Sequence, residues 1–142
     1  MSGLNLNRNV ALAALVGGLL IGTQAAAVTY RCSVGNYGVA GTTQVGIAKV
    51  AATWFGDGVI IDLAKNSIQQ TYGKRARKPE AISIVQRSAR FTVYGFETMV
   101  ETEGRDRKAK YTYRVYPDGR LKAFGGMKGG NYGTLTAAGN CR

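Results

Sequence analysis

The sequence predicts an all-β protein, a small antiparallel meander that forms a barrel or sandwich of about eight short strands. Residues 90–102 alternate between two faces with a period of two, and aromatic and β-branched residues are frequent there. Residues 116–120 (YPDGR) have the chemistry of a tight turn, because proline presets φ and glycine accepts positive φ. After residue 27, no segment has a convincing helical period.

The strands of this meander are expected at residues 90–102, 110–116 and 120–124, with a turn at residues 103–107 between the first two. The other expected strands are residues 28–34, 59–63, 68–72, 81–87 and 132–136. Glycine-rich residues 35–41 and basic residues 74–79 are expected to be loops. The early half of residues 42–55 alternates and favours a strand, but its alanines leave a short helix open.

Residues 1–27 have the layout of a signal peptide. Arg8 supplies positive charge, residues 10–21 form an uncharged apolar run, and small residues follow up to Ala27, where cleavage is expected. The apolar run is shorter than the roughly 20 residues that span a bilayer. Residues 28–142 are therefore expected to form a single exported β-domain, periplasmic or secreted, in a bacterium.

The chain has two cysteines, Cys32 and Cys141. In an oxidising compartment an even pair favours a disulfide, and one closing a loop of roughly 110 residues is worth about 4–5 kcal/mol in the loop-entropy model. The bridge requires neighbouring termini, as when the first and last strands pair. A metal site is disfavoured because two thiols without histidine fall short of the usual ligand set.

The composition argues against several kinds of catalysis. No histidine is present to act as a general base for a serine or cysteine nucleophile, so an enzyme is not expected, and neither is a cofactor. Glu97, Glu101 and Glu103 share a strand face and are the candidates for acid–base chemistry. The turn after them favours a simpler reading, in which Glu101 and Glu103 pair across strands with Lys108 and Lys110.

The formal net charge of +11 favours anionic partners. The first basic cluster is Lys74, Arg75, Arg77 and Lys78. The second is Arg105, Arg107, Lys108 and Lys110. A third set is Arg114, Arg120, Lys122 and Lys128, near Tyr113, Tyr116 and Tyr132. Because basic groups interleaved with aromatics suit anionic polymers, we expect a non-enzymatic envelope protein that binds an anionic polymer, an envelope surface or an acidic protein.

The signal peptide, the aromatic-x-Cys motif at residues 30–32, the run of strands and the terminal cysteine resemble the layout of the periplasmic inhibitors of C-type lysozyme. That resemblance implies a small β-barrel that inserts a loop into an enzyme cleft. It covers the layout alone: the inhibitory serine-glycine-x-basic-tyrosine loop has no match, and residues 128–132 (KGGNY) only approximate it. The alternative function is thus a secreted inhibitor or accessory factor that acts through a protruding loop such as residues 125–133.

Overall fold

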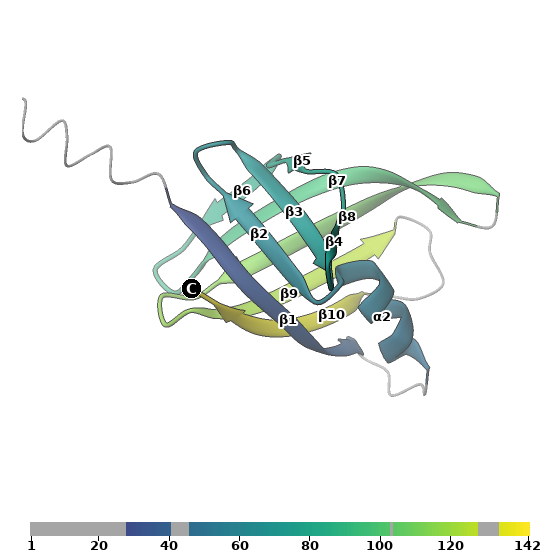
Figure 1. Ribbon diagram of the computed structural model, residues 1–142, viewed down its shortest axis with the longest axis horizontal. Helices are drawn as coiled ribbons and strands as arrows, with labels where there is room; N and C mark the ends of the chain where they lie inside the picture. The colour runs from purple at the N-terminus through teal and green to yellow at the C-terminus, as the bar shows by residue number, and fades with distance from the viewer. Residues whose placement is uncertain (1–27, 41–45, 103, 128–133) are drawn as a thin grey trace, which may run out of the picture.

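The computed structural model describes residues 28–40, 46–102, 104–127 and 134–142, so the expected signal peptide lies outside the described residues. The described chain is predominantly antiparallel β-structure, which confirms the predicted fold class (Figure 1). Its elements are β1 (Thr29–Val39), α2 (Ile47–Phe55), β2 (Gly58–Asp62), β3 (Ser67–Tyr72), β4 (Arg75–Ala76), β5 (Glu80–Ala81), β6 (Ile84–Arg87), β7 (Thr92–Thr102), β8 (Arg105–Val115), β9 (Arg120–Met127) and β10 (Leu135–Cys141).

All ten strands belong to one sheet, in the order β4-β3-β2-β1-β10-β9-β8-β7-β6, with β5 paired to β3. The sheet is not closed by hydrogen bonds, because β4 and β6 end this path without pairing to each other. It nevertheless curls over itself, so that β2 and β3 cross in front of β7–β9 (Figure 1). A buried hydrogen bond between Gln70 of β3 and Tyr113 of β8 joins the two layers. The result is an open, curled sheet with its core inside.

The core follows from strand alternation. On β8 the odd-numbered side chains from Ala109 to Val115 are buried, and the even-numbered ones face outward. On β7 one of the two expected faces holds buried Tyr94 and Phe96, and Phe96 stacks on Tyr111 with ring centroids 4.9 Å apart. The division into two faces made from the period of two is therefore confirmed for β8, whereas on β7 Val93 of the opposite face is buried too.

Residues 47–55 form helix α2, so the strand favoured for this segment is wrong there, and residues 42–45 lie outside the described residues. Ala51 and Phe55 are four residues apart and fully buried, and Trp54 packs on Tyr111 with ring centroids 5.4 Å apart. The helix covers one end of the curled sheet (Figure 1). A short apolar run fits both periods, and here contact with the sheet decides between them.

Several predicted boundaries also change. The turn expected at residues 103–107 is shorter, because Thr102 pairs directly with Arg105 and Gly104 takes a φ of 71°. Strand β1 runs on to Val39 through part of the predicted glycine loop. The strand expected at residues 81–87 is divided between β5 and β6, β9 extends to Met127, and β10 begins at Leu135.

The Cys32–Cys141 disulfide is present, as predicted, and it links residues 109 positions apart. The two cysteines are direct partners in the β1–β10 pairing, which places the two ends of the domain side by side. Among the described residues, no helix has both the length and the apolar character needed to cross a membrane.

Candidate functional site

Strand alternation divides the second predicted basic cluster. Arg105 and Arg107 fall on the same side of β8 as buried Tyr111, near the end of the β7–β8 hairpin. Lys108 and Lys110 fall on the opposite, outward side. The four residues therefore do not form one patch, and only the two lysines remain candidates for a site on the outer face.

The β8–β9 register adds two members of the third predicted set to these lysines. Arg114 is the direct partner of Lys122, and Thr112 is the direct partner of Phe124. All four belong to the outward side of the sheet, as Lys110 does. We call this surface the basic face and define it by these residues: Lys108, Lys110, Thr112, Arg114, Lys122 and Phe124.

Arg114 is held between two aromatic rings. Its guanidinium carbon lies 4.4 Å from the ring centroid of Phe91 and 5.0 Å from that of Phe124. Phe91 also packs on Tyr116, which lies under the guanidinium of Arg120 at 4.9 Å. Cations and rings thus alternate along the edge of the basic face, and each cation–π contact fixes an arginine in place. Arg114 Nε is buried and has no hydrogen-bond partner within the described part of the chain.

Two acidic groups near the basic face form ion pairs, one with Lys108 of that face and one with Arg120 outside it. Glu97 Oε2 lies 3.3 Å from Lys108 Nζ, and Asp118 Oδ2 accepts a hydrogen bond of 2.6 Å from Arg120 Nε. The backbone N–H of Arg120 also donates to Asp118, and this bond contributes most to lowering the pKa of that carboxyl. No carboxylate among the described residues forms an ion pair with Lys110, Arg114 or Lys122.

The ion pair of Lys108 corrects the expected carboxylate pairing. The two-residue turn places Glu101 opposite Asp106 and Glu97 opposite Lys110, and the salt bridge forms between Lys108 and Glu97. Glu103 lies outside the described residues. Glu97 is thus held by a lysine on an exposed surface, as expected of a solvated strand face.

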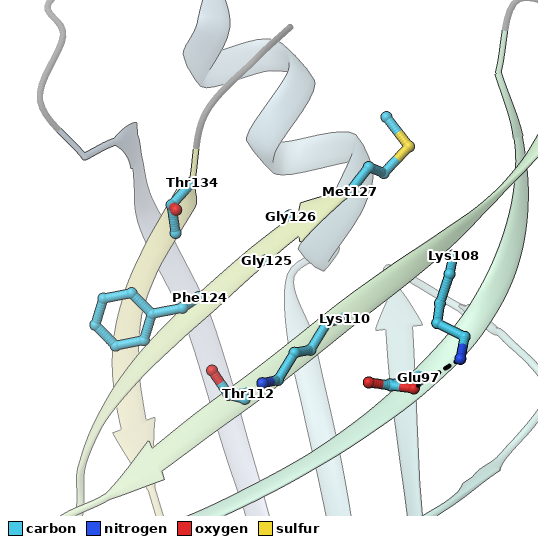
Figure 2. A pocket seen from close by; sticks show the side chains of 9 residues that line it. All are labelled: Glu97, Lys108, Lys110, Thr112, Phe124, Gly125, Gly126, Met127 and Thr134. Atoms are coloured by element: carbon cyan, nitrogen blue, oxygen red, sulfur yellow. Dashed lines mark ion pairs between the residues drawn. The ribbon is translucent and has the colours of Figure 1, made fainter. Parts of the chain in front are cut away.

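A hollow of about 480 Å³ lies on the same face; Thr112 and Phe124 line it, whereas Arg114 and Lys122 do not. Figure 2 shows Lys110 and Thr112 projecting from β8 and the ring of Phe124 projecting from β9, with the Glu97–Lys108 pair at one side. The hollow therefore combines Lys110, which has no ion pair among the described residues, with a hydroxyl and an aromatic ring. These groups suit a ligand with both anionic and apolar parts.

The first predicted cluster has a divided role. All four residues are exposed, but the guanidinium of Arg77 is hydrogen-bonded to other parts of the domain. It donates to the carbonyl oxygens of Thr53 (2.9 Å) and Trp54 (3.4 Å) at the end of α2. It also donates to Gln70 Oε1 (2.9 Å) and covers the ring of Tyr72 at 4.5 Å. Arg77 therefore stabilises the end of the helix, whose partial negative charge attracts a cation.

Behind Arg77 lies a buried polar connection. Gln70 is 3% exposed, and its Nε2 donates to the hydroxyl of fully buried Tyr113 at 2.7 Å. Burial raises the pKa of Tyr113 above its usual range and raises the pKa of Tyr72 to about 12. Both tyrosines are therefore protonated donors or acceptors near neutral pH.

Some features of the basic face could be predicted from the sequence, and others could not. Alternation placed Thr112 and Arg114 on one side of their strand, and the third basic set included Lys122. The clamp formed by Phe91 and Phe124 was missed, because these residues lie 23 and 10 positions from Arg114 in the sequence and reach it only through the register of β7, β8 and β9. Lys128 and Tyr132 of the third set lie outside the described residues. A scan against models of protein families and searches of curated protein sequences and of solved structures find no match to this chain.

Proposed function

We propose that this protein is a non-enzymatic, exported domain of the bacterial envelope that binds an anionic polymer through its basic face. The observation that carries the proposal is the pair Arg114 and Lys122, two cations that stand directly opposite each other on adjacent strands. Like charges in that position destabilise a sheet. An anionic ligand between them would turn this repulsion into attraction.

The rest of the basic face supports an extended ligand. Alternate side chains on a strand are about 7 Å apart, so Lys110, Thr112 and Arg114 follow one another along β8 on the basic face, beyond Lys108 with its ion pair to Glu97. Phe124 adds an aromatic surface beside them, which suits the flat faces of sugar rings or other cyclic units. Residues 75 and 76 form β4 beside β3, so the loop expected at residues 74–79 is wrong at these two positions. Lys74, Arg75 and Lys78 are exposed and lack the aromatic clamp, and we propose them as a second, weaker contact.

The proposal is tested by binding of the purified protein to lipopolysaccharide and heparin across a salt series. We expect affinity to fall steeply with salt, because bound polymer releases counterions. The double variant Arg114→Gln/Lys122→Gln should weaken binding and make the salt dependence shallower. The matched control Lys49→Gln/Lys65→Gln removes the same charge from α2 and from the β2–β3 turn.

Equal binding by the two double variants would contradict a role for the basic face. If binding were lost only when Lys74, Arg75 and Lys78 are neutralised, the binding site would lie in that basic segment instead. Binding restricted to acidic proteins would replace the polymer with a protein partner.

The β7–β8 hairpin favours a second candidate, an inhibitor or accessory factor. Among the described residues, β6 pairs with β7 only from Thr92 to Gly95, and β9 pairs with β8 only from Ala109 onward. The far end of the hairpin therefore extends past its neighbours as a two-stranded ribbon, on which Met99 is 58% exposed (Figure 1). Binding to an envelope enzyme that resists salt and is lost in Met99→Glu would support this candidate over the polymer.

A further inference from the structure

We propose that Arg114 and Lys122 form a subsite for one phosphate monoester group of the ligand. This inference rests on the proposed function and specifies the group that the basic face recognises. The subsite consists of two cations that are direct cross-strand partners. The next outward-facing pair on the same two strands supplies the hydroxyl of Thr112 and the ring of Phe124.

The orientation of Arg114 limits how a ligand can approach. Phe91 and Phe124 contact its guanidinium at 4.4 and 5.0 Å, and its Nε is buried. A ligand that meets this arginine therefore binds its two terminal Nη groups and not Nε. The two Nη groups donate parallel hydrogen bonds to two oxygens of one group, as in bidentate arginine–phosphate and arginine–carboxylate pairs.

The charge of the subsite distinguishes among ligand groups that can offer two oxygens to an arginine. Neither Arg114 nor Lys122 has an acidic partner in the described part of the chain, so a matching ligand group carries two negative charges. A phosphate monoester has a charge near −2 at neutral pH and three acceptor oxygens, two for the arginine and one for the lysine. A carboxylate or a sulfate ester carries one charge and would leave one cation unmatched.

The chain has no histidine, which makes the selection measurable by pH. The second pKa of a phosphate monoester is about 6, whereas arginine, lysine and carboxylate side chains ordinarily keep their charge between pH 5.5 and 7. The charged and titratable groups around the subsite are Glu97 from β7, Arg90 beside Phe91, Lys108 and Lys110 from β8, Tyr116 and Asp118 from the β8–β9 turn, and Arg120 from β9. A fall in affinity over this range would therefore report the ligand's own proton.

The experiment is an NMR titration of the purified protein with glucose 6-phosphate and with glucose 6-sulfate at pH 7 and pH 5.5. We expect the phosphate to bind about tenfold more tightly than the sulfate at pH 7, because one ion pair is lost with the sulfate. We expect this preference to shrink about threefold at pH 5.5, and amide shifts to centre on Thr112, Arg114 and Lys122. Arg114→Gln should abolish the preference, and Lys65→Gln should preserve it.

Phe124→Leu tests the clamp, since it removes one ring and leaves every charge in place. We expect the preference for phosphate to fall while the melting temperature shows that the domain still folds. Equal, pH-independent binding of the two esters would overturn the subsite, as would absence of binding by both. If lipopolysaccharide or heparin binding still depended on Arg114 and Lys122, the proposed function would survive that result. If the phosphate preference is found, comparing phosphorylated with dephosphorylated lipopolysaccharide distinguishes a glycolipid source from a free sugar phosphate.

Discussion

Replacing Arg77 with alanine should destabilise the domain, even though this residue belongs to the densest basic run of the sequence. Its guanidinium donates to two carbonyl oxygens at the end of α2 and to Gln70. The two bonds at the exposed helix end are worth about 0.5–1 kcal/mol each. Loss of the third leaves the acceptor of buried Gln70 unpaired, at a cost of about 1 kcal/mol or more. The expected loss is about 2–3 kcal/mol of unfolding free energy.

For a domain of this size, such a loss corresponds to a fall in melting temperature of roughly 8–15 °C. Urea unfolding followed by circular dichroism at pH 7 measures the free energy directly. Arg75→Ala is the matched control, because Arg75 is an exposed arginine two positions away in the same run. We expect that variant to stay within about 0.5 kcal/mol of the unmodified protein. If Arg77→Ala and Arg75→Ala were equally stable, Arg77 would have no structural role.

Two further predictions concern the disulfide and the buried tyrosines. The double variant Cys32→Ala/Cys141→Ala should lose about 4–5 kcal/mol in urea unfolding, because the bridge closes a loop with a sequence separation of 109; a loss below 1 kcal/mol would contradict the loop-entropy argument. Burial raises the pKa of Tyr72 from 10.0 to about 12, so the folded state holds this proton more tightly than the unfolded state does. The contribution of this proton to the free energy of unfolding is fully present below pH 10 and is lost as the pH rises toward 12. Tyrosinate absorbance should therefore appear in two steps, with Tyr72 and Tyr113 ionising late, and complete ionisation of the folded protein near pH 10 would refute this.

The sequence alone was sufficient for features that depend on near neighbours. The period of two in residues 90–102 and 110–116 identified both strands and the two faces of each, and the structure shows which side chains are buried. The YPDGR turn was also predicted correctly: the N–H of Gly119 donates to the carbonyl of Tyr116, and Gly119 has a φ of 89°. The Cys32–Cys141 pairing followed from there being only two cysteines.

For helix α2 the local sequence pattern did not distinguish a helix from a strand. Its nine residues contain apolar side chains at spacings that fit either a strand or a helix. Burial of Ala51 and Phe55 against the curled sheet decides for the helix. That contact depends on strands far along the chain, which a local pattern does not contain.

The basic face shows the same division. Sequence determined that the chain is basic, that Thr112 and Arg114 share one side of a strand, and that Lys122 lies on the strand that returns. Only the tertiary structure decided that Lys122 stands opposite Arg114, that Phe91 and Phe124 hold the guanidinium, and that Arg77 is bound to the end of a helix. The physical reason is register: a strand's period assigns the face of each side chain, whereas its partner across the sheet depends on turn length and on the packing of the whole core.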